Sequence, residues 1–347
     1  DAVRSIAILL VIGHHAAYRF SGSNLDPIAA LLRSVGWIGV DIFFALSGFL
    51  IVRILVKDSS SGDVTAFFVR RFWRIVPLYV VALFVFAAGT MLTGLDAQLL
   101  SRIWIPALLL NGWAIPLLGI DGVPYLIAWS LSVEEFSYLV FGLAALALSR
   151  GLVVAVCLFL IVANGLRWST LALDLFEPNY LYFFVPARLD AIAFGGLGAL
   201  GFYRSLTNKA WCGPVAGWMT LLLVVLFQWA GGIGGWFLPA FGYALFGFSC
   251  GVWVTCLAHG QGPQNIGLRL AVSLLAPFGK LSYFIYLFHL FVLEAIRIVS
   301  SRMGVDLQFW TAMLCAIPIC FLLARVSWRH FEYPLIRRSH GRPSPGD

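Results

Sequence analysis

Long apolar runs, each close to the length of a membrane span, occupy most of the chain. A bilayer core of about 30 Å is crossed by roughly 20 apolar helical residues, and within lipid only helices and closed barrels satisfy their backbone groups internally. Barrel strands alternate polar and apolar residues over short segments, and these runs do not alternate. The sequence therefore predicts an all-α, polytopic transmembrane helix bundle of about ten spans. The expected spans are residues 3–20, 34–56, 75–94, 125–148, 151–166, 180–203, 211–230, 236–258, 272–299 and 307–327.

The composition argues against a soluble, fibrous or disordered protein. Of the 347 residues, 61% are hydrophobic and 11% are charged, whereas soluble domains carry roughly 45–50% apolar and about 25% charged residues. The net charge of +7 could indicate nucleic acid, but the basic residues lie between the apolar runs rather than in one patch. We interpret them as topology signals and expect no nucleic-acid partner. The six cysteines lie in apolar stretches without a CxxC pair, so we expect buried hydrophobes and no metal.

The distribution of basic residues also orients the bundle. Residues 101–119 are apolar but interrupted by Pro106, Asn111 and Pro116, which suits a re-entrant or interfacial segment. If this segment does not span, most of the 23 Lys and Arg residues fall on one side together with both termini, and Arg167 falls in a loop on the other side. The positive-inside rule makes the first side, and therefore both termini, cytoplasmic.

The chain is expected to hold one large domain and a tail. The transmembrane domain should cover residues 1–333, and residues 334–347 should form a short polar cytoplasmic tail that is disordered. Pro334 is expected to stop the last helix. No GxxxxGK[ST], GxGxxG, HExxH or GxSxG motif occurs, so nothing supports an ATPase, a dinucleotide enzyme, a zinc hydrolase or a serine hydrolase.

Ionisable residues within spans are costly, which makes each of them a candidate for function. Arg4 and His15 are 11 residues apart in the first span, so they share a helix face about 16 Å apart along the axis. A neutral imidazole near mid-membrane can take a proton from a hydroxyl and return it. A packing histidine with a snorkelling arginine is the structural alternative. His14 points about 80° away, and we interpret it as a packing residue.

Two other spans hold buried charges. Asp41 is flanked by glycines that permit close backbone approach, and it could pair with His15 or Arg4, or lie in water at the outer end of its span. Arg188 and Asp190 lie two residues apart in the sixth span. At that spacing they cannot pair on a helix, so each requires a partner from another helix.

Three further clusters are candidates for binding or support. Arg74 lies four residues after Arg70 and three after Arg71 in a loop. This spacing suits phosphate binding, although composition alone favours a topology signal that also binds anionic lipid. Glu134 and Glu135 point about 100° apart, so they form no dyad, and one should face the bundle interior. Tyr286 and His289 lie on one side of their span, either as site residues or as a packed polar seam.

These motifs together resemble the membrane-bound acyltransferase 3 family, and the resemblance covers residues 1 to about 338. In this sequence the matching motifs are Asp1-x-x-Arg4, the R-x10-H that joins Arg4 to His15, GVDIFFALSGFLI (Gly39 to Ile51), the R-x-x-R from Arg71 to Arg74, WSLSVEE (Trp129 to Glu135), ARLDAIAFG (Ala187 to Gly195), LSYFIYLFHL (Leu281 to Leu290) and FEYP (Phe331 to Pro334). Two departures from the family pattern concern local helix geometry. After WSLSVEE the family usually continues with a polar residue and then Phe and Tyr, whereas here Phe136 and Ser137 precede Tyr138. Leu290 follows His289 at a position where a proline is common.

The resemblance implies an integral membrane enzyme, in a bacterial inner membrane, that O-acylates carbohydrates and related molecules. Cytoplasmic acyl-CoA, with acetyl-CoA first among the donors, would be held by Arg71 and Arg74. His15 would act as general base or carry the acyl group, and Arg4 would orient the thioester. The resemblance leaves Glu134, Asp41, Arg188, Tyr286 and His289 as catalytic, acceptor or supporting residues.

The acceptor is expected to be a glycan, a glycolipid or a related molecule, with membrane lipids as the other partners. The main alternative function is a secondary transporter or exporter of a small polar or glycan substrate, because it would also place Arg188, Asp41 and His15 in the membrane. A third possibility is an inactive family member that serves as a scaffold. The intact pair of Arg4 and His15 argues against it.

Overall fold

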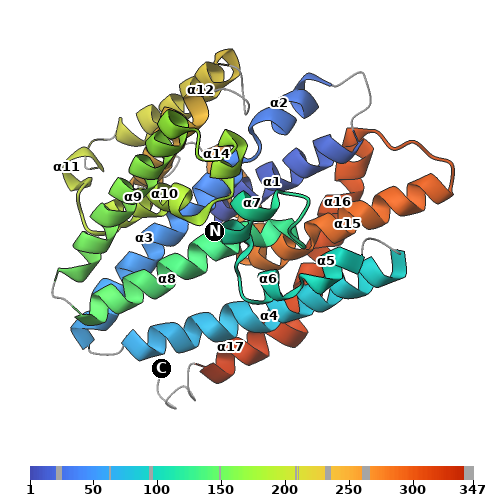
Figure 1. Cartoon of the computed structure of the whole chain (residues 1–347), viewed down its shortest axis with the longest axis horizontal. Helices are drawn as coiled ribbons and strands as arrows, with labels where there is room; N and C mark the ends of the chain where they lie inside the picture. Colours follow the sequence, from blue (N-terminus) through green and yellow to red (C-terminus); the bar gives the residue numbers. More distant parts are fainter. Residues whose placement is uncertain are drawn as a thin grey trace. The chain divides into compact units, whose positions relative to one another are not determined.

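The computed structural model describes residues 1–20, 26–61, 64–93, 97–147, 150–207, 209, 211–230, 236–259 and 266–339, and every regular element in these ranges is a helix (Figure 1). The α-helices are α1 (Ala2–Phe20), α2 (Pro27–Val35), α3 (Ile38–Ser61), α4 (Val64–Thr93), α5 (Ala97–Ser101), α6 (Trp104–Ala107), α7 (Asn111–Leu118), α8 (Trp129–Ala147), α9 (Gly151–Leu173), α10 (Leu189–Ala199), α11 (Arg204–Thr207), α12 (Cys212–Trp229), α13 (Tyr243–Ala258), α14 (Ile266–Lys280), α15 (Ser282–Arg302), α16 (Phe309–Ser327) and α17 (Tyr333–Ser339). The 3-10 helices η1 (Leu126–Ala128), η2 (Pro178–Tyr182) and η3 (Val185–Arg188) and the π-helices η5 (Leu238–Gly242) and η6 (Trp328–Glu332) connect them. The expected all-α fold is confirmed.

Seven helical segments of the described residues are long and apolar enough to cross a membrane. They are Ile38–Asp58, Val64–Leu92, Leu126–Ala147, Gly151–Leu173, Leu238–Ala258, Ser282–Arg302 and Phe309–Arg337. This confirms a polytopic transmembrane bundle, whereas the number of ten spans and the cytoplasmic termini stay predictions. The expected first span forms α1, which is outside these seven and carries Arg4, His14, His15 and Arg19.

Two spans that the sequence predicts as continuous helices are broken. Residues 180–203 form η2 and η3 followed by the 11-residue α10, and a proline stands at the start of each 3-10 helix. Proline lacks an N–H and disfavours helical geometry in the residue before it, so it starts helices rather than continues them. Residues 272–299 divide at Leu281 into α14 and α15. In both places the apolar run is longer than the helix that it forms.

Two expectations about helix ends are wrong. The residues from Arg70 to Arg74 lie inside α4, which begins at Val64 instead of residue 75. The chain also continues as a helix beyond Pro334, because η6 leads directly into α17 and Pro334 lies in the first turn of α17. After a π-helix the missing N–H of that proline breaks no regular ladder. Residues 340–347 of the expected tail lie outside the described residues.

The segment 101–119 is interrupted, as the sequence predicts. It forms the short helices α6 and α7, and α7 begins at Asn111. The Asn111 side chain donates from Nδ2 to the carbonyl oxygens of Pro124 (2.8 Å) and Tyr125 (3.2 Å), and it is fully buried. A polar residue inside an apolar segment therefore ties this segment to the loop that leads into α8.

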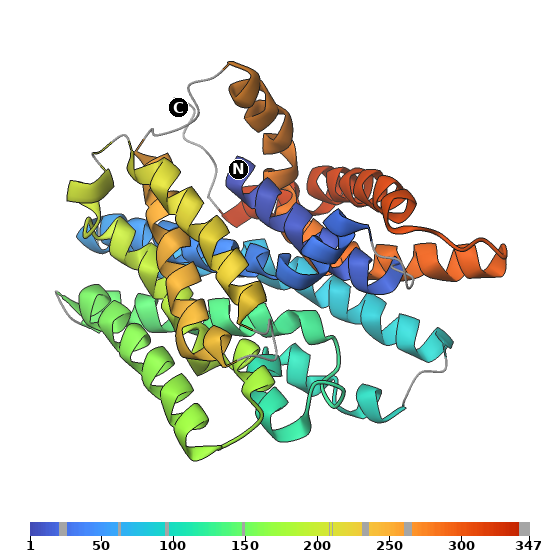
Figure 2. The same ribbon diagram turned by 90° about the horizontal axis from the view of Figure 1, so that it is seen from above.

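The chain divides into two compact units. The first unit comprises Asp1–Val40, Val69–Ala82 and Pro263–Asp347, and the second comprises Asp41–Phe68 and Leu83–Gly262. In the first unit α1 packs against α2, α14, α15 and α16 (Figure 2). The end of α14 meets the start of the chain closely, since a Cβ on Gly279 would lie 1.8 Å from the carbonyl oxygen of Asp1. This unit surrounds α1, the helix that carries His15.

In the second unit α10 packs against α9 and α13, and two glycines bring it into backbone contact with α3. A Cβ on Gly48 would lie 1.9 Å from the carbonyl oxygen of Ile192, and a Cβ on Gly195 would lie 1.9 Å from that of Ala45. Small residues allow membrane helices to approach to backbone contact. The glycines of two sequence motifs therefore define one helix crossing.

Substitution of Gly195 by alanine is expected to force α3 and α10 apart, because the added Cβ would lie 1.9 Å from the carbonyl oxygen of Ala45, which is too close for any non-bonded contact. We expect Gly195→Ala to lower the free energy of unfolding by about 1–3 kcal/mol, measured by thermal unfolding in detergent. Gly165→Ala is the matched control, because that glycine lies in α9 with nothing within 4 Å of its Cβ position. Equal stability of the two variants would contradict the crossing.

Candidate active site

Two histidines contact each other in the first unit. Nε2 of His289 in α15 lies 3.1 Å from Nδ1 of His15 in α1, and the ring centroids are 5.0 Å apart. His15 Nδ1 also lies 3.0 Å from the carbonyl oxygen of Val11, one turn earlier in α1. His289 is fully buried, and its Nδ1 lies 2.7 Å from the carbonyl oxygen of Tyr286. The histidine pair joins the two helices that the sequence singles out for this residue type.

Carbonyl oxygens determine which ring nitrogen of each histidine carries the proton. A carbonyl only accepts, so His289 Nδ1 donates to Tyr286, and the Nε2 of neutral His289 is left as an acceptor. His15 Nδ1 then faces two acceptors, the Val11 carbonyl and His289 Nε2, and must donate to them. The remaining nitrogen of His15, Nε2, therefore holds a lone pair. An unprotonated imidazole nitrogen is what a general base requires.

The arginine pattern on α4 belongs to the same unit as the histidine pair. Arg71 is partly buried and Arg74 is exposed, and the exposed aromatic residues Phe72 and Trp73 lie between them in the sequence. The next residue, Ile75, accepts a hydrogen bond at its carbonyl oxygen from the Tyr283 hydroxyl of α15 (2.8 Å). Tyr283 precedes His289 by six residues, which is about 9 Å along the helix axis. One helix therefore connects the arginine segment with the histidine pair.

Arg4 and Tyr286 are the other candidates in the first unit. Arg4 stands at the start of α1 and pairs with Asp1 at 3.3 Å, and its side chain is 22% exposed. Tyr286 is buried, and its ring centroid lies 6.0 Å from that of His289. The unit thus holds six of the nine candidate site residues, which are Arg4, His15, Arg71, Arg74, Tyr286 and His289.

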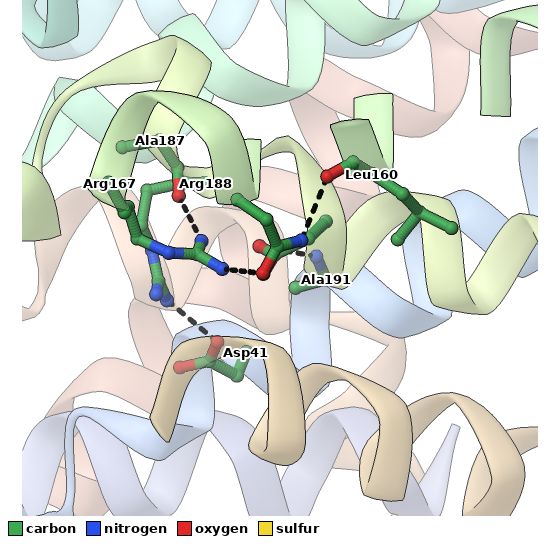
Figure 3. Close-up of polar contacts among 8 residues, drawn as sticks. Asp41, Leu160, Arg167, Ala187, Arg188 and Ala191 are labelled. Atoms are coloured by element: carbon green, nitrogen blue, oxygen red, sulfur yellow. Dashed lines mark hydrogen bonds and ion pairs between the residues drawn. The ribbon is translucent and has the colours of Figure 1, made fainter. Parts of the chain in front are cut away.

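The second unit holds two ion pairs that are fully buried (Figure 3). Arg188 Nη2 lies 2.7 Å from Asp41 Oδ1, and Arg167 Nη2 lies 2.7 Å from Asp190 Oδ2. Arg167 also donates to the carbonyl oxygen of Ala187 at 2.6 Å. A charge inside a span is tolerated only where it is paired within the protein. The expectation that Arg188 and Asp190 each require a partner from another helix is confirmed.

Aromatic rings complete the surroundings of Arg188. Its guanidinium carbon lies 3.9 Å from the ring centroid of Tyr243, 5.3 Å from that of Tyr182 and 6.0 Å from that of Phe44. A ring face attracts a cation, most strongly where water is excluded. Two guanidinium nitrogens, Nε and Nη1, have no hydrogen-bond partner among the described residues. Arg188 is therefore held by one carboxylate and by ring faces.

Two expectations for Asp41 are corrected by this arrangement. Asp41 is fully buried, so it does not lie in water, and its partner is Arg188 instead of His15 or Arg4. The contact to the His15 ring comes from His289 instead. The third candidate of the second unit, Glu134, accepts hydrogen bonds from Ser47 (3.0 Å) and Tyr138 (2.8 Å).

The role of Arg167 is not evident from the sequence. The end of the apolar run at residue 166 predicts a loop position for it, but α9 continues to Leu173 and buries this side chain completely. Asn164 Oδ1 accepts from Arg167 at 2.9 Å, and this i, i+3 spacing of two polar residues is the signal that could have revealed the buried face. Within the described ranges, no group of three or more His, Cys, Asp or Glu side chains could hold a metal ion.

Comparison with known protein families agrees with these motifs. The family model described as "Acyltransferase domain" matches residues 1–325. The chain belongs to this acyltransferase family. The resemblance found in the sequence is thereby confirmed.

Curated relatives match almost the whole chain at low identity. The YrhL protein of Bacillus subtilis is 25% identical over 362 residues, which cover 96% of this chain and 54% of the relative. Peptidoglycan O-acetyltransferase OatA of Listeria monocytogenes is 24% identical over 96% of the chain and 55% of the relative. The O-acetyl transferase of Shigella phage Sf6 is 24% identical over 98% of the chain and 96% of the relative. The chain thus spans about half the length of the first two, and no solved structure matches it.

The buried pair of the acyltransferase domain can be tested by a double-mutant cycle. Asp41→Leu leaves the Arg188 charge buried without its carboxylate, which should cost about 3–5 kcal/mol of stability. Asp41→Leu combined with Arg188→Met removes both charges and should recover most of that loss. Thermal unfolding of the two single variants, Asp41→Leu and Arg188→Met, and of the double variant measures the coupling. A double variant as unstable as Asp41→Leu alone would show that the pair does not act as a unit.

Proposed function

We propose that the chain is an integral membrane O-acyltransferase that moves an acyl group from a CoA thioester to a hydroxyl of a glycan or glycolipid. Acetyl-CoA is the first candidate for the donor. Membership of the acyltransferase family supports the reaction class. The names of the relatives in Listeria monocytogenes and phage Sf6 support O-acetylation, and the former supports a glycan acceptor. The bacterial inner membrane is the proposed location, in keeping with the organisms of these relatives and with the apolar helices.

The observation that carries the proposal is the order of residues along α15. Tyr283 contacts α4 next to Arg74, and His289 contacts His15 six residues further on. Arginine suits the phosphates of CoA because its planar fork binds phosphate oxygens in a bidentate manner. The thioester of a donor held by Arg71 and Arg74 would then lie toward the histidines. Acyl transfer requires that the donor and the base are held in a fixed relative position, and α15 contacts both of their proposed sites.

In the proposed reaction, His15 Nε2 takes the proton of the acceptor hydroxyl while that oxygen bonds to the acyl carbon. The C–S bond then breaks, and the CoA thiolate receives the proton from the imidazolium. His289 Nε2 accepts the hydrogen bond from His15 Nδ1 throughout, which stabilises the charged ring. The same nitrogen of His15 could instead attack the thioester and carry the acyl group to the acceptor, with the same overall balance.

The other candidates take supporting roles in this proposal. Arg4 would orient the thioester or stabilise the negative charge that develops on its oxygen. Asp41, Arg188 and Glu134 would support the second unit, because their contacts are directed to one another and to neighbouring helices. Tyr286 would hold the His289 ring through its backbone carbonyl.

The proposed activity is tested with membranes that contain the protein. Labelled acetyl-CoA is added on the cytoplasmic side, and the envelope glycans are analysed for covalently bound label by mass spectrometry. The expected result is an ester-linked acetyl group that depends on the protein. Gradient-driven uptake of a substrate without a covalent acyl product would overturn the proposal in favour of a transporter.

His15→Ala should lower acyl transfer by about 10²–10⁴-fold, the usual cost of losing a general base. The protein should remain folded and inserted, which thermal unfolding and membrane fractionation would check. Transfer by His15→Ala at the wild-type rate would contradict the assignment. His14→Ala serves as the control, because this neighbouring ring contacts His15 only edge-on and binds the carbonyl oxygen of Leu32.

His289 is proposed as a positioning residue, so a conservative change should rescue it. His289→Gln keeps an acceptor for His15 Nδ1 and should retain more activity than His289→Leu, which has none. The pH–rate profile is the second measurement. Loss of the acceptor lowers the basicity of His15, so the acidic limb of the profile, where His15 becomes protonated, should move to lower pH. Equal activities and equal profiles for the two variants would reduce His289 to a packing residue.

Replacement of Arg71 and Arg74 together by alanine should raise the KM for acetyl-CoA, with a smaller effect on kcat, because the lost contacts hold the donor before and during reaction. Arg53→Ala, which removes another exposed arginine, is the control. An unchanged donor KM would assign the pair to topology or to anionic lipid.

A further inference from the structure

A polar pocket lies at the end of α15 in the first unit. It has a volume of about 410 Å³, and its lining includes Arg19, Arg297, Ser301, Asp306 and Gln308. These side chains offer both donors and acceptors, and Phe20 adds an aromatic surface. The pocket thus provides the mixed polar and aromatic lining that fixes the orientation of a small polar ligand.

An apolar groove adjoins this pocket. It has a volume of about 660 Å³ and runs between α15 and α16, with Phe288, Ala295, Ile296, Ile319 and Leu323 among its lining. Three residues line both the groove and the pocket, namely Ser300, Val305 and Leu307. The two hollows therefore adjoin each other along this shared wall, the polar one at the end of α15 and the apolar one along it.

The groove opens on a surface that lipid chains can reach. Val299 is 56% exposed and Met303 is 72% exposed, and both lie in its lining. A hydrocarbon chain in the bilayer could enter sideways without crossing any polar surface. The polar pocket at its end is what distinguishes this groove from an ordinary lipid-facing helix surface.

The pocket is connected to the histidine pair through two helices. Arg19 lies one turn after His15 in α1 and donates from Nη1 to the His15 carbonyl oxygen at 3.4 Å. Arg297 follows His289 by eight residues, which is about 12 Å along α15. Tyr283 and the arginine segment of α4 lie in the opposite direction along α15. The pocket and the proposed donor site are thus on opposite sides of the histidines.

The charges of the pocket favour a neutral, hydroxyl-rich ligand. The lining holds Arg19, Arg297 and Asp306, and Glu294 pairs with Arg297 from outside the lining through both carboxylate oxygens, with Nε–Oε2 at 3.0 Å. These two positive and two negative charges balance, so the pocket has no strong preference for an anion. Carboxylates accept from sugar hydroxyls and guanidinium groups donate to them, which suits vicinal hydroxyls.

We propose that this pocket and groove bind the acyl acceptor as a lipid-linked saccharide, with the sugar in the pocket and the chain between α15 and α16. The role as acceptor site rests on the proposed function, whereas the binding itself does not. The arrangement places the sugar on the side of the histidines opposite the donor. It also accounts for a polar pocket that adjoins an apolar groove.

Photo-labelling tests the binding without any reaction. The protein in phosphatidylcholine nanodiscs is exposed to an alkyl glucoside and an alkyl N-acetylglucosaminide, each with a diazirine in its chain, and to an alkylphosphocholine of the same chain. Peptide mapping locates the label. We expect either glycoside to label residues 288–323 about tenfold more than the phosphocholine probe, equivalent to about 1.4 kcal/mol. Equal labelling by all three probes would reduce the groove to a bulk lipid surface and overturn the proposal.

Two pairs of variants localise the site. Asp306→Asn should remove most of the preference for a glycoside, and Arg302→Gln is its control, because Arg302 lies at the same helix end outside the pocket lining. Ala295→Trp should fill the groove and lower all labelling about tenfold, and Leu322→Trp is its control on the exposed face of α16. Thermal unfolding shows whether Ala295→Trp is folded, and the exposed Asp306 keeps the test decisive if it is not. Unchanged preference in Asp306→Asn would overturn the sugar assignment.

The outcomes separate this inference from the proposed function. Acetyl transfer to a soluble oligosaccharide without preferential labelling would leave the enzyme activity standing and overturn the acceptor site. Preferential labelling without any acetylated product would support the site and overturn the proposed chemistry.

Discussion

A charge that leaves water for the interior of a membrane protein must find its counter-charge there, and this constraint organises the second unit. The free energy of burying one unpaired ion is several kcal/mol, which is comparable to the whole stability of a domain. Arg167 and Arg188 are fully buried, and each has a carboxylate on a different helix at 2.7 Å. The helices α3, α9 and α10 are therefore joined by contacts that cannot be exchanged for lipid. Nonpolar packing in a membrane is less selective, because lipid tails are as apolar as leucine.

The first unit meets the same constraint in a different manner. It places titratable imidazoles in the interior, and imidazole can be buried as a neutral group that still hydrogen-bonds. The chain of contacts from Tyr286 through His289 to His15 ends at a ring nitrogen that holds a lone pair. The second unit pairs its permanent charges, whereas the first unit holds imidazole rings, which can gain and lose a proton. The two units thus meet the same constraint with different residue chemistry, through paired charges in the second unit and a pair of imidazoles in the first.

Much of the fold could be predicted because hydropathy and motif order are local properties of the sequence. The apolar runs gave the helices, and the spacing of Arg188 and Asp190 indicated that each needs a partner elsewhere. The partners themselves could not be predicted, since a sequence carries no distances between helices, and neither of the two partners considered for Asp41, His15 and Arg4, is the observed one. Hydropathy also could not locate helix breaks within an apolar run, such as Leu281 or the prolines of η2 and η3. The end of α9 was misplaced because Arg167 resembles a loop residue until its buried partners are known.

The crossing of α3 and α10 couples two of the motifs by their spacing. Asp41 precedes Gly48 by seven residues, and Arg188 precedes Gly195 by the same number, so the ion pair and the glycine contact lie two turns apart on matching faces. The glycines set how near the two backbones come, and the ion pair sets how each helix is turned about its own axis. One added or deleted residue between the two points would rotate the charge by about 100° while the glycine contact stayed in place. The number of residues between the charge and the glycine in each motif is therefore as constrained as the identity of those residues.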